Sequence, residues 1–179
     1  MGSSIIRVSI IILMLTLTLT ASAIHFGKKA TATICFTPGG QCADQVIHEI
    51  DGAQVMIKVQ AYVLTNPDIL AALANAKARG VSIRVVLDKS QVTDSKTTIS
   101  AANYLKSLGI PVWIDYKPAI AHNKVILIDD DITLIGSYNF SEAAQNKNAE
   151  NLNTIVDRHF YRVYDRNFEK RLKESRKYG

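Results

Sequence analysis

Short runs of β-branched and aromatic residues alternate along the chain with segments in which apolar residues recur at helical spacing. The first pattern is typical of β-strands and the second of amphipathic helices. The predicted strands cover residues 31–37, 54–64, 81–88, 110–115, 122–128 and 132–137. The predicted helices cover residues 43–51, 67–79, 98–108, 141–147 and 157–177. This alternation predicts an α/β fold with a mixed, largely parallel β-sheet flanked by helices on both faces.

Polar residues indicate where two of these helices begin and how they face. Asn66 fits the N-cap of the helix at residues 67–79, and Pro67 fits its first position. The C-terminal helix carries an apolar stripe and, roughly opposite, a basic stripe. The basic stripe predicts either a face near nucleic acid or an ordinary solvated face, and it consists of Arg158, Arg162, Arg166 and Lys170.

The first 23 residues differ in character from the rest of the chain. Arg7 precedes an apolar run over residues 8–19, which is short for a membrane span, and Ala21-Ser22-Ala23 fits a signal-peptidase site. We therefore predict a signal peptide over residues 1–23, cleaved after Ala23, with an uncleaved anchor as the alternative. Residues 24–179 would then be a single domain, periplasmic or secreted, with no stable membrane insertion.

The two cysteines, Cys35 and Cys42, flank a turn-rich segment. In an oxidising compartment such a close pair predicts a disulfide, and two free thiols are the alternative. Neither a second cysteine pair nor a histidine cluster completes a set of four ligands nearby, so no metal site is predicted.

The net charge of +5 favours a polyanionic partner, which includes both nucleic acid and acidic lipid surfaces. The sequence has no G-x-G-x-x-G after its first strand and no Walker A lysine loop. Dinucleotide and nucleoside triphosphate binding are therefore not indicated.

The residues suited to phosphate chemistry lie together, in and after the strand predicted at residues 122–128. Because side chains alternate along a strand, His122 and Lys124 are expected side by side on one face. Asp129 is expected on the opposite face or in the following turn, and therefore away from the substrate.

The hairpin turn after this strand decides which side chains meet. A two-residue turn at Asp129 and Asp130 would place Ser137 opposite His122, and cross-strand partners share a face. A three-residue turn would shift this register, and the three consecutive aspartates leave both turns open.

Three residues further along complete the candidate set. Gly136 allows close approach of a ligand or of another backbone. Asn139 can donate its side-chain amide to a phosphate oxygen, and Glu150 can accept the proton of an imidazole N–H and so orient the ring. The predicted catalytic residues are His122, Lys124, Ser137, Asn139 and Glu150, with Asp129 and Gly136 in supporting positions.

The spacing H-x-K-x4-D-x6-G-S, followed by Asn139, is the motif of the phospholipase D superfamily. The chain resembles the small bacterial periplasmic endonucleases of that superfamily, and the resemblance covers most of residues 24–179. It implies a phospholipase D-like fold and a sequence-nonspecific, metal-independent endonuclease that needs no cofactor. The implied substrate is DNA, single- or double-stranded, with RNA as a further substrate.

The resemblance also implies a homodimer, because small members of the superfamily carry one motif per chain. Here the other histidines have no lysine two residues on: His25, His48 and His159. One His122 would attack phosphorus and form a phosphohistidine, while its copy acts as acid and then as base. Lys124, Ser137 and Asn139 would neutralise the developing charge. The alternatives are a lipid phosphodiesterase with the same chemistry and an inactive nucleic-acid-binding module.

Overall fold

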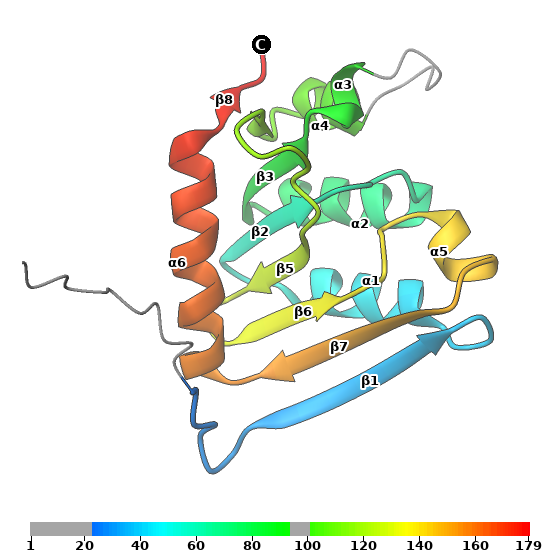
Figure 1. Ribbon diagram of the computed structural model, residues 1–179, viewed down its shortest axis with the longest axis vertical. Coiled ribbons are helices and arrows are strands. Elements are labelled where there is room, and N and C mark those ends of the chain that lie inside the picture. Colours follow the sequence, from blue (N-terminus) through cyan, green and yellow to red (C-terminus); the bar gives the residue numbers. More distant parts are fainter. Residues whose placement is uncertain (1–22, 94–100) are drawn as a thin grey trace, which may run out of the picture.

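The computed structural model describes residues 23–93 and 101–179 (Figure 1). Apart from Ala23, the predicted signal peptide lies outside the described residues, as do residues 98–100 of one predicted helix. Within the described part of the chain, no helix is both long enough and apolar enough to cross a membrane.

The described residues form one eight-stranded sheet with the strand order β1-β7-β6-β5-β2-β3-β4-β8. Its strands are β1 (Thr31–Thr37), β2 (Met56–Ala61), β3 (Ser82–Asp88), β4 (Val112–Asp115), β5 (Lys124–Ile128), β6 (Ile132–Gly136), β7 (Glu150–Val156) and β8 (Arg176–Lys177).

The sheet is mixed, as predicted, but the expectation that it is largely parallel is wrong. Among the described strands, only β2–β3 and β3–β4 pair in parallel, and the other five pairings are antiparallel. The parallel part is the strand–helix–strand region in the middle of the chain. Four of the antiparallel pairings arise because the β5–β6 hairpin and β7 add to one side of β2 and β1 then closes that side, and the fifth joins β8 to β4 at the opposite edge.

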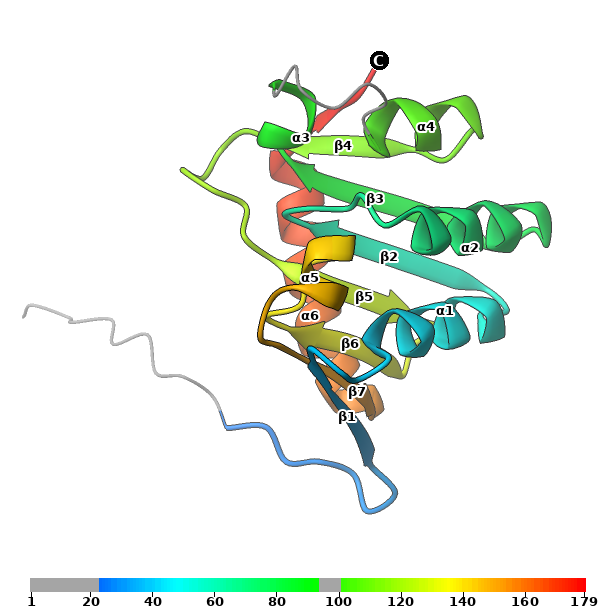
Figure 2. The same cartoon turned by 90° about the vertical axis from the view of Figure 1, so that its right-hand side faces the viewer.

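Helices cover both faces of the sheet, as predicted (Figure 2). The helices α1, α2 and α4 lie on one face and α6 lies on the other. Their bounds, with the two shorter helices, are α1 (Cys42–Gly52), α2 (Pro67–Ala78), α3 (Ser90–Thr93), α4 (Ala101–Ser107), α5 (Glu142–Asn146) and α6 (Arg158–Glu174). The side chain of Asn66 accepts hydrogen bonds from the backbone N–H groups of Asp68 and Ile69, so this residue caps α2 as expected.

The core has two parts, one on each face of the sheet. Alternation along β5 shows how the strand joins them: Ile126 and Ile128 belong to the part under α1 and α2, while Val125 and Leu127 belong to the part under α6. All five residues of β5 are buried. The strand that begins at Lys124 is therefore fixed by packing on both sides.

The basic stripe of α6 is exposed and faces away from the sheet. The acidic residues of the helix point the other way, because Asp165 and Glu169 form ion pairs with the buried Lys58 on β2. In Figure 1, α6 lies near the ends of β6 and β7 that are distant from α5.

Cys35 on β1 and Cys42 on α1 form a disulfide with a Cα–Cα distance of 5.6 Å.

Candidate active site

The candidate residues gather at one edge of the sheet. Lys124 begins β5, Gly136 ends β6 and Glu150 begins β7. Because β6 is antiparallel to both neighbours, the start of β5, the end of β6 and the start of β7 lie at the same edge. His122 comes immediately before this edge, although the structure begins β5 two residues later than predicted. Residues distant in sequence thus share one small region.

The hairpin register excludes the two-residue turn, one of the two turns that the sequence left open. Ile128 pairs with Ile132, so three residues form the loop, and Ser137 does not lie opposite His122. The physical reason is the backbone of the turn, since Asp129 and Asp130 both adopt positive φ values, of 46° and 73°. Aspartate tolerates this left-handed conformation better than most residues do.

Lys124 lies at the centre of the group with only 6 % of its surface exposed. Its Nζ atom donates a hydrogen bond of 2.9 Å to the carbonyl oxygen of His122, and it lies 5.1 Å from the centre of the Tyr62 ring. Burial lowers the pKa of the Lys124 ammonium, the charge of Glu150 raises it, and burial prevails. The site therefore holds a poorly solvated cation.

His122 is exposed, and its ring centre lies 4.6 Å from that of Tyr62, with an angle of 52° between the ring planes. Tyr62 therefore contacts both residues of the H-x-K pair. It follows the end of β2, and its backbone N–H donates to the carbonyl oxygen of Asn123. In the sequence, the signal for Tyr62 is its position at a strand's carboxyl end, where ligands often bind in α/β sheets.

Ser137 is exposed at the end of β6 and is held by the neighbouring strand. Its N–H donates to the carbonyl oxygen of Asn151, and its Oγ accepts the N–H of that residue at 3.1 Å. The close approach predicted at Gly136 is to a backbone, since a Cβ atom there would lie 2.0 Å from the carbonyl oxygen of Asn151. Gly136 therefore lets β7 bring Glu150 alongside β6.

Asn139 and Glu150 lie at the same edge and differ in their contacts. The Oδ1 atom of Asn139 is buried and has no hydrogen-bond partner, and the residue lines a cavity of ≈ 540 Å³. Glu150 accepts a hydrogen bond of 3.1 Å from Asn148 and interacts electrostatically with Lys124. The hydrogen bond expected from His122 to Glu150 is not formed between these described residues.

Asp129 lies in the turn at the other end of the hairpin, as the alternation argument predicted. Its carboxylate accepts three backbone N–H groups, from Gln54 at 2.6 Å and from Val55 and Met56 at 2.8 Å. Burial opposes ionisation of this carboxyl, but the three donors outweigh burial and hold the pKa below its ordinary value. The residue fastens the turn to the start of β2.

Chemically, this edge of the sheet presents an exposed imidazole, a buried ammonium, a hydroxyl and a side-chain amide. An imidazole can act as a nucleophile, and the other three groups can donate hydrogen bonds to an anion. Among the residues that the structure describes, no group of three or more His, Cys, Asp and Glu side chains could hold a metal ion.

Comparisons with known proteins agree with this geometry. Residues 46–172 match the family model of the cardiolipin synthase, PLD-like domain. A phospholipase D family member, Nuc from Salmonella typhimurium, is 34% identical, with a TM-score of 0.79 over 84% of this chain and 99% of that chain. A protein named phospholipase D from Rickettsia conorii is 40% identical over 141 residues, which are 79% of this chain and 69% of that protein.

The fold alone is also shared with NucT from Helicobacter pylori, at 23% identity and a TM-score of 0.75 over 84% of this chain and all (100%) of that one. The family model spans most of the described chain, including the whole edge from Tyr62 to Glu150. With this match, and with the H-x-K pair gathered on one aromatic ring, the chain belongs to the phospholipase D-like family of phosphodiesterases.

Proposed function

We propose that this phosphodiesterase is a sequence-nonspecific endonuclease that hydrolyses the phosphodiester bonds of DNA without a metal cofactor. The observation that carries the proposal is the exposed imidazole of His122 beside the buried ammonium of Lys124, both in contact with Tyr62. The similarity to Nuc, which extends over 99% of that chain, supports a nuclease of this size. The net charge of +5 suits a polyanionic substrate.

In the proposed reaction, a nitrogen of His122 attacks phosphorus and the bond from phosphorus to the 5′-oxygen breaks. The leaving oxygen takes the electron pair and a proton from a second imidazole, which leaves a phosphohistidine. Water, deprotonated by that second imidazole, then attacks phosphorus and releases His122. Lys124, Ser137 and Asn139 donate to the non-bridging oxygens while charge develops on them.

The second imidazole is proposed to come from a second copy of the chain. The sequence has a single H-x-K pair, so one chain supplies one such imidazole. A symmetric dimer would bring the two copies of His122 together. If so, an equal mixture of wild-type protein and the His122→Ala variant should, after subunit exchange, have about one quarter of the activity of the same total amount of wild-type protein, whereas independent monomers would have about one half.

We also propose that the protein acts in the periplasm or outside the cell. The disulfide between Cys35 and Cys42 supports this, because such bonds persist in oxidising compartments. Cell fractionation with an antibody against the protein tests it, and recovery in the cytoplasm alone would overturn it.

A lipid phosphodiesterase is the second candidate, because the Rickettsia relative at 40% identity is named phospholipase D. One experiment separates the two: purified protein is incubated in excess EDTA with plasmid DNA and, separately, with phosphatidylcholine vesicles. Nicking of the plasmid that persists in EDTA and is lost in His122→Ala supports the nuclease.

The matched control is His159→Ala, which removes another exposed histidine on α6 and should nick DNA at the wild-type rate. Choline release without nicking favours the lipid enzyme. DNA binding without any cleavage would indicate the inactive binding module, and loss of cleavage in EDTA would refute the metal-independent reaction.

A further inference from the structure

His122 belongs to a loop that has little packing of its own. Residues 116–123 connect β4 to β5, and most of them are exposed. Pro118 is half-buried, and Ala121 is buried, with 8% of its surface exposed. The position of His122 therefore depends on the few contacts that fix the backbone next to it.

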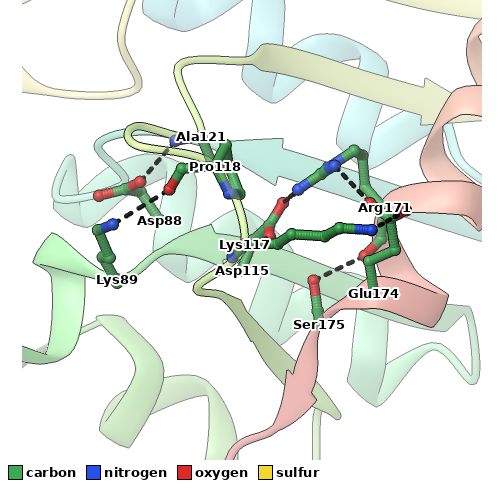
Figure 3. A network of polar contacts seen from close by, with 9 residues as sticks. All are labelled: Asp88, Lys89, Asp115, Lys117, Pro118, Ala121, Arg171, Glu174 and Ser175. Carbon is green, nitrogen blue, oxygen red and sulfur yellow. Dashed lines mark hydrogen bonds and ion pairs between the residues drawn. The ribbon is translucent and has the colours of Figure 1, made fainter.

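Figure 3 shows two neighbouring aspartates that hold different parts of this loop, Asp88 at Ala121 and Asp115 at Lys117. Asp88 ends β3 and Asp115 ends β4, and the two residues are direct partners in the parallel ladder. Both are buried, with 2% and 1% of their surface exposed. Carboxylates buried at the carboxyl ends of strands need several hydrogen bonds to offset their desolvation.

Asp88 accepts hydrogen bonds from two backbone N–H groups. Its Oδ1 atom accepts the N–H of Ser90 at 2.9 Å, and its Oδ2 atom accepts the N–H of Ala121 at 2.7 Å. The second bond is buried and joins the end of β3 to the residue immediately before His122. A side chain 33 positions away in the sequence thus fixes the backbone at His122.

The backbone on the other side of His122 is fixed as well. The carbonyl oxygen of Asn123 accepts the N–H of Tyr62 at 2.9 Å, and the carbonyl oxygen of His122 itself accepts from Lys124. Ala121 is therefore held by β3, His122 by β5, and Asn123 by the residue that follows β2. The bond to Asp88 is the tie nearest to His122 on its N-terminal side, and the Nζ atom of Lys89 donates to the carbonyl oxygen of Pro118 further back, at 3.1 Å.

We infer that Asp88 is a positioning residue for His122, whose backbone it holds so that the imidazole stays in line with the scissile phosphorus. This inference rests on the proposed function of His122. Ionisation of Asp88 fits the role, since burial raises its pKa but the hydrogen bonds from Ser90 and Ala121 outweigh burial and lower it. A carboxylate suits two N–H donors, whereas an asparagine would turn its own NH₂ group towards one of them.

Asp115 differs in what it holds. Its Oδ2 atom accepts from the guanidinium of Arg171 on α6, including a bond of 2.7 Å from Nε, and its Oδ1 atom accepts the N–H of Lys117 at 3.2 Å. It therefore ties the start of the loop to the C-terminal helix. It is the matched control, because the same change of Asp to Asn one strand away breaks a buried contact that does not reach His122.

The test compares Asp88→Asn and Asp115→Asn in the full chain. For Asp88→Asn we expect kcat on DNA to fall by on the order of thirtyfold with KM within about threefold of wild type, since a displaced nucleophile slows chemistry more than binding. We expect Asp115→Asn to lower the melting temperature while kcat stays within about threefold of wild type.

A second readout does not depend on DNA cleavage. In spectra of protein labelled with ¹⁵N-histidine, we expect the ring signals of His122 to shift in Asp88→Asn and to stay in place in Asp115→Asn, with His159 unchanged in both. If wild-type protein does not cut DNA, the proposed function fails, and these spectra still test whether Asp88 positions the ring.

If each variant loses kcat only to the extent that its melting temperature falls, Asp88 has a merely structural role. An unchanged kcat and unchanged His122 signals in Asp88→Asn would also overturn the inference. If Asp88→Asn does not fold, hydrogen exchange in the wild-type protein tests the hydrogen bond between the Ala121 N–H and Asp88. The Ala121 amide must exchange far more slowly than amides of exposed loops, and exchange at their rate contradicts the hydrogen bond to Asp88.

Discussion

The two ends of the β5–β6 hairpin carry residues of the same motif and have opposite character. At the turn end, Asp129 accepts three backbone N–H groups, and the carbonyl oxygen of Asp131 accepts the N–H of Asp157 at 2.8 Å. At the other end, His122 and Ser137 are exposed, and the Oδ1 atom of Asn139 is buried without a hydrogen-bond partner.

This difference supports the proposal that one motif serves folding at one end and chemistry at the other. Polar groups that are satisfied within the chain stabilise the native state, whereas a buried polar atom without a partner costs free energy. Thr133, towards the turn end of β6, also has a buried hydroxyl without a partner in the described part of the chain, so the contrast between the two ends rests on the exposure of His122 and Ser137. Equal weight for His, Lys and Asp in the motif is therefore misleading, and substitutions at the two ends should separate activity from stability.

The largest effect is expected for His122→Ala. Loss of the nucleophile should lower kcat on DNA by at least about a thousandfold. The side chain is exposed, so the free energy of unfolding should stay within about 0.5 kcal/mol of wild type. Steady-state cleavage of plasmid DNA and urea unfolding measure the two quantities. A variant that loses activity only in proportion to its stability would contradict the separation.

Lys124→Met should come next. Methionine keeps most of the length of the side chain and removes the ammonium, so kcat should fall by on the order of a hundredfold through lost stabilisation of developing charge. Stability should change little, because a poorly solvated buried cation contributes little net free energy to folding. A rise in KM with kcat unchanged would instead mean that Lys124 binds the substrate and the transition state equally well.

Asp129→Asn should show the reverse behaviour. It removes the charge and one acceptor from a group that binds three N–H donors, so unfolding should become easier by about 1–2 kcal/mol, with kcat within about threefold of wild type. The control is Asp130→Asn, the same change at the next left-handed residue, which should shift stability by less than about 0.5 kcal/mol.

The lowered pKa of Asp129 adds a pH dependence to this pair. A carboxyl whose pKa is lower in the folded state contributes stability above its unfolded pKa, and the contribution is lost as pH falls through the folded pKa. The stability difference between wild type and Asp129→Asn should therefore be full at neutral pH and shrink in acid. An equal difference at every pH would show that charge is not the cause.

The sequence was sufficient for the elements whose residues signal them locally. The cap at Asn66 and the β-branched run of β5 predicted a helix start and a buried strand that the structure confirms. It also placed Asp129 in the turn, because strand alternation is a local property. In contrast, β7 was missed because its asparagines, Asn151 and Asn153, are rare in strands, and their positions depend on pairing with β6.

The rest of the site could not be read from the sequence, for two physical reasons. The hairpin register depends on the left-handed backbone of Asp129 and Asp130, which three identical residues do not specify. The contacts of His122 are long-range: Asp88 reaches its backbone from β3, and Tyr62 reaches its ring from the end of β2. Motif spacing identified the chemistry, while tertiary packing decides which residues hold it in place.

The smallest expected effect is that of Glu150→Gln, and it sharpens the comparison within the chemical end itself. The charge of Glu150 raises the pKa of Lys124 against the larger effect of burial. Its removal should lower that pKa further, so the alkaline limb of the kcat/KM profile, where Lys124 loses its proton, should move to lower pH while the rate near neutral pH changes little. The control is Glu142→Gln, which removes an exposed carboxylate of α5 and should leave the limb in place. A lower kcat at every pH without a shift of the limb would instead mean that Glu150 orients the His122 ring in the complex with substrate, because a misaligned nucleophile slows the reaction whatever the charge of Lys124.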